Sequence, residues 1–154
     1  MMSLSYKVIE ALNGLTLVTA ESCTGGGIGC ALTAVPGSSV VYKGGIISYT
    51  NEVKSSQLGV SKELLDRVGA VSPEVAAEMA CGVRTLLNAD VAISVTGLAG
   101  PTGDMFGNPV GTVFIGYCDH SVTNVSEYHF HGNREQIRQQ AIESALHIVL
   151  QNVR

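Results

Sequence analysis

The sequence contains no tryptophan, few aromatic residues (5%) and few charged residues (14%) in a chain of 154 residues. Hydrophobic residues make up 45% of it. This composition excludes an intrinsically disordered protein and predicts a single compact domain over residues 1–154. The net charge is -4, so the broad basic face of a duplex-binding protein is missing. We expect no nucleic-acid partner, although a small anionic ligand needs only one or two local cations.

Patterns typical of metal sites and membrane segments are missing as well. The four cysteines, at positions 23, 30, 81 and 118, form no C-x-x-C pair, and the four histidines form no H-E-x-x-H motif. We therefore expect no metal, and thiols that stay reduced in a cytoplasm. No apolar run is long enough to cross a bilayer, and the first residues lack the features of a signal peptide. These absences predict a cytoplasmic protein without membrane contact.

The spacing of apolar residues predicts alternating helices and strands. Helices are expected at residues 4–13, 24–34, 51–58, 61–68, 72–87 and 134–153. Strands are expected at residues 15–20, 45–49, 90–96, 112–117 and 122–130. Helices and strands alternate early, and the last two strands form an antiparallel pair. The expected fold class is therefore α/β, a single domain with a mixed β-sheet covered by helices. Asn51 is expected to cap the third helix.

A serine stands where the first strand is expected to pass into a helix, in the stretch AESCTGGG. Ser22 then lies at the carboxyl edge of the sheet, where open α/β sheets bind ligands. We expect the amides from Cys23 to Gly27 to point outward without partners, which suits an oxyanion, a phosphate or a carboxylate equally. The stretch matches neither the G-x-S-x-G elbow nor a standard nucleotide loop. Taken alone it favours a structural turn, with Cys23 as a small buried hydrophobe.

A serine nucleophile needs a base, and lysine is one candidate because Ser-Lys pairs are a known variant. The chain has four lysines, at positions 7, 43, 54 and 62. Lys54 lies one helical turn past the strand expected at 45–49, and it would have to be partly desolvated to be neutral near pH 7. Tyr49 ends that strand, so its hydroxyl could bridge the lysine and the serine. Spacing alone still favours a solvated Lys54 and a tyrosine at the rim.

Two later segments carry further candidates. The loop SVTGLAGPTG starts from Thr96 at the end of a buried strand. Its glycines, Gly97 and Gly100 among them, allow either a close approach to a ligand or simply a tight turn. Arg134 and Arg138 stand at i and i+4 on the last helix, where such a pair can clamp a phosphate. A solvated pair of arginines explains this spacing equally well.

Six segments resemble, in this order, the CinA C-terminal domain family: TAESCTGG, PGSS, GGIISYTNEVKSSQLGV, GAVSPEVAAEMA, SVTGLAGP and NPVGTVFIG. The resemblance extends from about Val8 to Gln151. It implies a CinA C-terminal-like α/β/α fold. It also implies the activity of the family's stand-alone members, which deamidate nicotinamide mononucleotide to nicotinic acid mononucleotide and ammonia without a metal or a cofactor.

The resemblance also implies roles for individual residues. Ser22 matches the nucleophile, Lys54 the base, Tyr49 a tyrosine that assists it, and Thr96 a position that contributes a hydroxyl. In this mechanism Lys54 removes the Ser22 proton and the amides of the turn at 25–27 hold the oxyanion.

The expected substrate contacts come from the two glycine-rich turns and the last helix. These residues are Thr24, Gly25, Gly26, Gly97, Gly100, Arg134 and Arg138. The choice between the two arginines stays open, although one of them is expected to contact the substrate.

Two other functions fit the same residues. One is a nucleotide-binding or regulatory module that uses the same turn without catalysis, and the other is a scaffold subunit whose loops bind a protein partner. We expect a small-molecule substrate and a homodimer, because many small α/β enzymes complete their sites or edges in that way.

Overall fold

The computed structural model describes residues 2–153, which form one five-stranded sheet and six α-helices. In chain order the elements are α1 (Leu4–Ala11), β1 (Leu17–Glu21), α2 (Gly27–Thr33), the short 3-10 helix η1 (Ser38–Val40), β2 (Tyr42–Ile47), α3 (Asn51–Leu58), α4 (Lys62–Val68), α5 (Pro73–Leu87), β3 (Val91–Gly97), β4 (Thr112–Cys118), β5 (Thr123–His129) and α6 (Arg134–Asn152).

The sheet is mixed, and its strand order is β2-β1-β3-β4-β5. β1 pairs parallel with both β2 and β3, whereas β4 pairs antiparallel with β3 and with β5. Glu21, the last residue of β1, lies opposite Ile47 of β2 and Val95 of β3. The segments that follow these three strands therefore leave the sheet at the same edge, which is where ligands bind in open α/β sheets.

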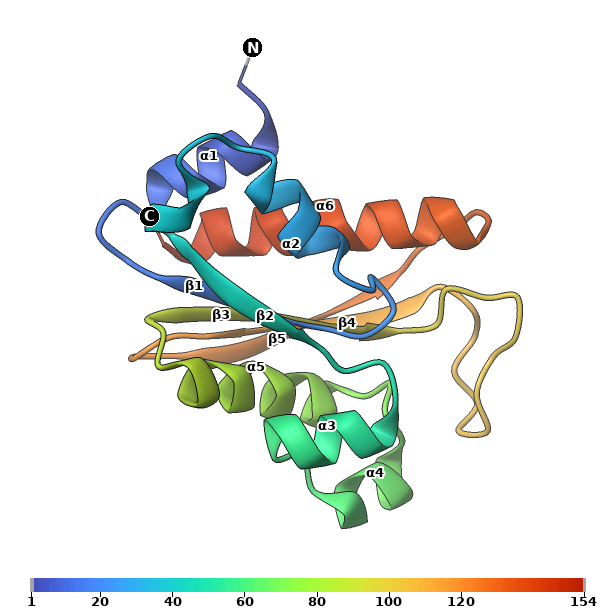
Figure 1. Cartoon of the computed structure of the whole chain (residues 1–154). Coiled ribbons are helices and arrows are strands. Elements are labelled where there is room, and N and C mark those ends of the chain that lie inside the picture. The colour runs from blue at the N-terminus through green and yellow to red at the C-terminus, as the bar shows by residue number, and fades with distance from the viewer. Residues whose placement is uncertain (1, 154) are drawn as a thin grey trace.

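Helices cover both faces of the sheet (Figure 1). α1, α2 and α6 lie on one face, and α3, α4 and α5 lie on the other. Alternate residues of a strand pack against opposite helix layers. Leu17 and Ile93 pack with the first set of helices, whereas Val18 and Ala92 pack with the second. All five residues of β1 are buried, as expected for a strand covered on both sides. This three-layer α/β/α arrangement confirms the predicted fold class.

Most of the predicted helices are confirmed within a few residues, and capping residues define the ends of the two longest helices. α5 begins after Ser72, whose hydroxyl accepts a hydrogen bond from the Val75 amide, and it ends at Asn88, which has a left-handed φ of 51°. α6 begins with a capping box in which the Asn133 and Gln136 side chains each accept a bond from the other's backbone. These contacts satisfy amides that the helices leave without partners.

The edge strand β2 differs most from its prediction. It begins at Tyr42, before the expected residues 45–49, and it ends at Ile47. Its residues alternate between half-buried and exposed, because successive side chains point to opposite faces of the sheet. None is fully buried, because β2 has a neighbouring strand on one side only. An edge strand of this kind carries a weak apolar signal, and the polar pair Tyr42-Lys43 concealed its start.

The helix after β1 also starts later than predicted. α2 begins at Gly27 and not at Thr24. The residues in between include Gly25 (φ 59°) and Gly26 (φ 99°), whose left-handed backbone is incompatible with a right-handed helix. Ser22 is therefore followed by a turn before α2 begins.

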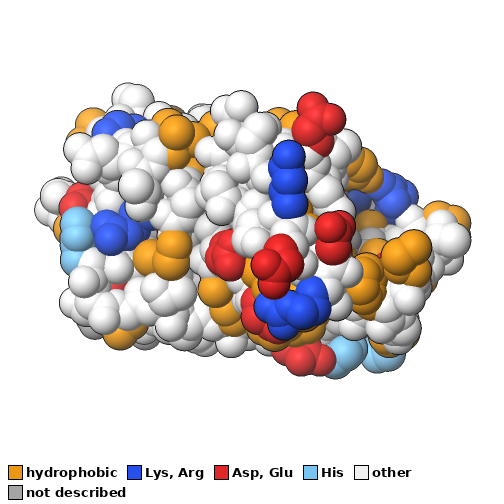
Figure 2. All heavy atoms as spheres, turned by 90° about the horizontal axis from the view of Figure 1, so that it is seen from below, with side chains coloured by type: hydrophobic (Ala, Val, Ile, Leu, Met, Phe, Trp, Pro, Cys, Tyr) orange, Lys and Arg blue, Asp and Glu red, His pale blue; other side chains and the backbone are white. Residues whose placement is uncertain are grey.

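The face formed by α3, α4 and α5 carries acidic and basic side chains next to one another (Figure 2). Neither kind of charge forms a continuous patch on this face. None of the helices within residues 2–153 combines the length and the apolar character needed to cross a membrane. The same residues contain no group of three or more His, Cys, Asp or Glu side chains placed to hold a metal ion.

Candidate active site

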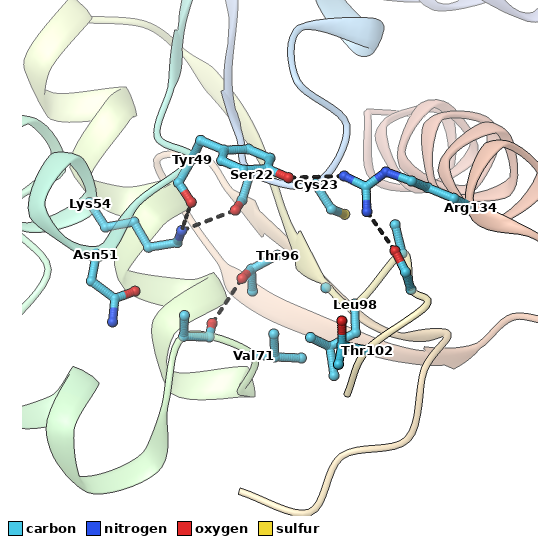
Figure 3. Close-up of a pocket in the computed structure, with 14 residues that line it drawn as sticks. Ser22, Cys23, Tyr49, Asn51, Lys54, Val71, Thr96, Leu98, Thr102 and Arg134 are labelled. Carbon is cyan, nitrogen blue, oxygen red and sulfur yellow. Dashed lines mark hydrogen bonds between the residues drawn. The ribbon is translucent and has the colours of Figure 1, made fainter. Parts of the chain in front are cut away.

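A pocket of about 270 Å³ opens at the carboxyl edge of the sheet, where the chain leaves β1 and β3 (Figure 3). Its walls come from five separate parts of the chain, which the strand order brings together. The lining residues are Ser22, Cys23, Tyr49, Asn51, Lys54, Ala70, Val71, Thr96, Gly97, Leu98, Ala99, Gly100, Thr102 and Arg134.

Ser22 and Lys54 face each other in this pocket (Figure 3). The Lys54 amine nitrogen Nζ lies 3.0 Å from the Ser22 hydroxyl oxygen Oγ, which is hydrogen-bond distance. Ser22 directly follows β1, and its amide donates to the Val95 carbonyl of β3 (3.0 Å). Lys54 is on α3, which follows β2, the other neighbour of β1. Two parallel strands side by side thus bring the two side chains to one place.

The Lys54 side chain is almost completely buried, with 1% of it exposed. This burial lowers the pKa of Lys54 from its ordinary 10.5 to about 8, because a protonated amine loses its hydration inside the protein. Within residues 2–153 no carboxylate forms an ion pair with it. Near physiological pH most of the amine is still protonated, but a much larger minority is neutral than in an ordinary lysine.

Two backbone carbonyls orient this amine. Besides its contact with Ser22, Lys54 Nζ donates to the carbonyl oxygen of Ser48 (2.8 Å) and to that of Tyr49 (3.4 Å). A neutral amine has two N–H groups and one lone pair. When the two carbonyls accept the two N–H groups, the lone pair is left for the Ser22 hydroxyl proton. This is the arrangement that a general base for a serine nucleophile requires.

The predicted bridge through the Tyr49 hydroxyl is wrong for this structure. The Tyr49 side chain is 56% exposed, and its hydroxyl accepts a hydrogen bond from Arg134 Nη2 (3.0 Å), as Figure 3 shows. The chain turns into α3 after β2, so that the Tyr49 carbonyl points toward Lys54 while the ring reaches toward α6. Tyr49 contacts Lys54 with its backbone carbonyl and Arg134 with its ring hydroxyl.

The two arginines of α6 have different positions. Arg134 lines the pocket, and its Nη1 donates to the Gly100 carbonyl (2.6 Å). Arg138, one helical turn later, does not line it. Instead its guanidinium donates to the carbonyls of Cys23 (3.0 Å) and Thr24 (3.1 Å). The structure thus places Arg134 at the pocket and Arg138 behind the turn that carries Ser22.

The amides at the start of α2 were expected to be without partners, and this expectation is wrong, whereas the structural turn that the stretch alone favoured is observed. The buried carboxylate of Glu21 occupies the start of α2, accepting hydrogen bonds from the amides of Ile28 (2.9 Å) and Gly29 (3.0 Å). The Thr24 hydroxyl donates to the same carboxylate (2.7 Å). The positive end of the helix dipole is therefore neutralised by the protein's own acid.

The predicted substrate contacts in this turn consequently do not line the pocket: Thr24, Gly25 and Gly26. Two of the amides expected to be free are also engaged, since Gly25 donates to the Ser22 carbonyl (3.0 Å) and Gly27 to the Thr24 carbonyl (2.9 Å). These bonds close the turn, so its glycines are structural.

Cys23 contributes its backbone and not its thiol. Its side chain is 6% exposed, and burial raises the pKa of the thiol to about 11, so that it stays protonated. This agrees with the prediction that Cys23 is a small buried residue. Within residues 2–153 the Cys23 amide donates to no other residue, and its close acceptor is the sulfur of its own side chain. Cys23 lines the pocket next to Ser22.

The residues predicted from the second glycine-rich loop do line the pocket: Thr96, Gly97 and Gly100. The Thr96 hydroxyl donates to the Ala70 carbonyl (2.8 Å), which ties the end of β3 to the segment before α5. With its proton engaged, Thr96 presents the pocket with an oxygen that can accept a hydrogen bond.

Several pocket residues were not predicted. Thr50 and not Asn51 caps α3, because its hydroxyl accepts from the Val53 amide (3.3 Å), and Asn51 consequently lines the pocket. Val71 and Leu98 carry no sequence signal beyond being apolar. The role of Glu21 did have a signal, namely an acidic residue that ends a fully buried strand.

A comparison with protein-family models shows that residues 2–153 match the CinA C-terminal domain. The chain belongs to the CinA C-terminal domain family. The match covers every segment for which the resemblance was stated, and it confirms that resemblance.

Curated relatives of this CinA domain are longer proteins. A competence-damage inducible protein of Halothermothrix orenii is 48% identical over 135 residues, which are 87% of this chain and 33% of the relative. A CinA-like protein of Thermosynechococcus vestitus is 52% identical over 120 residues, which are 77% of this chain and 29% of the relative. The chain thus spans about a third of the length of these relatives.

Solved structures match the CinA domain over almost its whole length. A CinA superfamily protein from Escherichia coli is 36% identical with a TM-score of 0.92, and the match covers 97% of this chain and 90% of that one. A competence/damage inducible protein from Agrobacterium tumefaciens is 38% identical with a TM-score of 0.93, covering 96% and 92%. The three-layer fold is therefore shared with these proteins.

The substitution Glu21→Gln tests the role of the buried carboxylate. It keeps the size of the side chain but replaces one acceptor oxygen with an NH₂ group that faces hydrogen-bond donors. We expect the free energy of unfolding, measured by chemical denaturation, to fall by about 1–3 kcal/mol. Glu143→Gln on the exposed side of α6 is the control, with an expected change below about 0.5 kcal/mol. Equal stability of the two variants would show that Glu21 does not hold the turn.

Proposed function

We propose that this CinA domain is a serine amidase that converts nicotinamide mononucleotide to nicotinic acid mononucleotide and ammonia. The observation that carries the proposal is the 3.0 Å contact between Lys54 Nζ and Ser22 Oγ, with the amine buried and its pKa lowered. The substrate comes from the resemblance of the residues around Ser22 and Lys54 to amidase members of the family.

In the first step, neutral Lys54 takes the hydroxyl proton of Ser22 while the serine oxygen attacks the carboxamide carbon. The carbonyls of Ser48 and Tyr49 hold the amine in place before the proton arrives. They also stabilise the ammonium that forms, because both remain acceptors for it. No third side chain is needed to orient this base.

The tetrahedral intermediate needs a donor for its oxyanion, and the Cys23 amide provides one. It belongs to the residue after the nucleophile and donates to no other residue within residues 2–153. One such donor typically stabilises the transition state by about 3–4 kcal/mol. Protonated Lys54 then gives its proton to the leaving ammonia, and a water molecule hydrolyses the acyl-enzyme. The turn at Gly25–Gly27 takes no part in this step, in contrast to the expectation from sequence.

The charges of the pocket support an anionic nucleotide as substrate. Lys54 and Arg134 line it, whereas no acidic side chain does, although the whole protein is net acidic at -4. Arg134 now donates to the Gly100 carbonyl and the Tyr49 hydroxyl, and a 5′-phosphate is a stronger acceptor than either. The substrate's pyridinium ring is positively charged, so that its binding further disfavours protonated Lys54.

Substitutions of the two central residues test the activity. With purified protein and nicotinamide mononucleotide, we expect the rate of ammonia release to fall at least about 10³-fold in Ser22→Ala, which has no nucleophile, and in Lys54→Met, which has no base. Both variants should still be thermally stabilised by the nucleotide, because the phosphate-binding side of the pocket is intact.

Lys62→Met removes an exposed lysine from α4 and is the matched control, with wild-type turnover expected. Wild-type turnover in Ser22→Ala would contradict the assignment of the nucleophile. A wild-type protein that is stabilised by the nucleotide yet releases no ammonia would identify a binding module instead of an enzyme.

The position of Arg134 predicts a phosphate-specific effect. In Arg134→Gln we expect the KM for nicotinamide mononucleotide to rise about 10- to 100-fold, because a charge-assisted bond to the phosphate is lost. The KM for nicotinamide riboside, which has no phosphate, should change little. Arg67→Gln, an exposed arginine of α4, controls for the change in net charge. An equal rise in KM for both substrates would place the phosphate elsewhere.

A further inference from the structure

A second group of reactive side chains lies away from the pocket. The sulfur atoms of Cys81 on α5 and Cys118 on β4 are 3.2 Å apart. The Thr123 hydroxyl of β5 lies 3.5 Å from the first sulfur and 3.4 Å from the second. Both cysteines are free thiols. Three elements therefore converge on one pair of thiols, to which the proposed amidase chemistry gives no role.

Close packing of α5 on the sheet brings these thiols together. A Cβ atom at Gly116 of β4 would lie 2.5 Å from the Ala76 carbonyl oxygen of α5, so the absence of a side chain there is what lets the helix approach. Cys118 is two residues further along β4 and points to the same face of the sheet. Cys81 is just over one helical turn beyond Ala76. The pair is held by the main packing of the domain and not by a mobile loop.

Small molecules can reach this pair from solvent. A surface depression of about 270 Å³ is lined by both cysteines together with Arg84, His120 and Thr123. Cys81 is half-buried and Cys118 is buried, so an oxidant meets Cys81 first. Burial raises the pKa of the Cys81 thiol, and the nearby guanidinium of Arg84 opposes that rise. The Arg84 Nε is buried without a hydrogen-bond partner among residues 2–153.

We propose that Cys81 and Cys118 form a redox-active dithiol that closes to an intramolecular disulfide when it meets a peroxide or a small disulfide. The bridge joins α5 to β4. A thiol reductant opens it again.

The reaction with a peroxide has two steps. The Cys81 sulfur first attacks the peroxide, taking one oxygen to become a sulfenic acid and releasing an alcohol or water. The Cys118 sulfur then attacks the Cys81 sulfur, and the hydroxyl leaves as water with the thiol proton. Two thiols lose two electrons and two protons in total, and the peroxide accepts them. With a small disulfide as oxidant, thiol–disulfide exchange gives the same bridge and two small thiols.

This site is separate from the proposed active site. β4 runs antiparallel to β3, and Cys118 lies opposite Ala92, near the start of β3. The dithiol is therefore at the edge of the sheet opposite to the one at which Ser22 lies. Whether the pocket is an amidase or a binding site does not affect the inference.

The disulfide should stabilise the folded domain against unfolding. It would close a long loop between residues 81 and 118 and so restrict the unfolded chain. For a domain of this size we expect the Tm to rise by roughly 5–10 °C on oxidation and to return on reduction.

The experiment treats the full chain with hydrogen peroxide, and in parallel with oxidised glutathione, then unfolds it in an alkylating reagent and maps its peptides by mass spectrometry. We expect a loss of two hydrogen atoms, a linked peptide pair that contains Cys81 and Cys118, and the rise in Tm. Cys81→Ser should form no bridge. Cys30→Ser, which removes an exposed cysteine on the opposite face of the sheet, should behave as the wild type.

Two results would overturn the proposal. One is an oxidised wild type in which Cys81 and Cys118 are both fully alkylated while Cys30 is oxidised. The other is a bridge that contains Cys23 or Cys30. A disulfide between Cys81 and Cys118 that leaves the Tm unchanged would contradict the expected stabilisation. Because Cys81 is only half-buried, its serine variant should fold, so the comparison does not depend on a substitution at the buried Cys118.

Discussion

The candidate site depends on the burial of one amine. Moving a lysine amine out of water is costly unless the amine becomes neutral or finds partners. Lys54 has no carboxylate partner among residues 2–153, and three oxygen atoms surround its Nζ, from Ser22, Ser48 and Tyr49. A carboxylate there would hold the lysine protonated and prevent its proposed use as a base. Burial of Lys54 thus costs stability, and the same burial lowers the pKa of the amine and favours its reactive neutral form. Functional sites often lower stability in this way.

The polar groups at this edge of the sheet form two sets with different tasks. Glu21 and Arg138 hold the turn after β1 from behind, the first through amides of α2 and the second through carbonyls of the turn. Lys54 and Arg134 face the pocket in front. Because the turn is fixed by the first set, Ser22 needs no contact with a ligand to be in position. Such preorganisation is what an acyl-transfer site requires.

Much of the fold could be predicted from the sequence, because apolar spacing marks helices such as α5 and short apolar runs mark buried strands such as β3. The site could be predicted only in part. The sequence placed Ser22 and Lys54 near the same edge of the sheet, but its spacing favoured a solvated Lys54, because α3 is too polar to show that this lysine is buried. The occupant of the α2 N-terminus could not be predicted either, because the position of the Glu21 side chain depends on packing between β1 and α2. Sequence patterns therefore predict where a residue lies in the fold, whereas its hydrogen-bond partners depend on tertiary contacts.

How much of Lys54 is neutral at physiological pH can be measured directly by titrating its amine. The protein is labelled with ¹³C at lysine Cε, and the Lys54 resonance is identified as the one that is missing from the spectrum of Lys54→Arg. The chemical shift of this resonance in the wild type is then followed by NMR as the pH is raised. Burial favours the neutral form, so the midpoint should lie below the ordinary value. We expect a midpoint near the pKa of about 8, with the amine mostly protonated below it and mostly neutral above it. A midpoint near the ordinary value of 10.5 would contradict it, because Lys54 would then be an ammonium at physiological pH and could not accept the Ser22 proton.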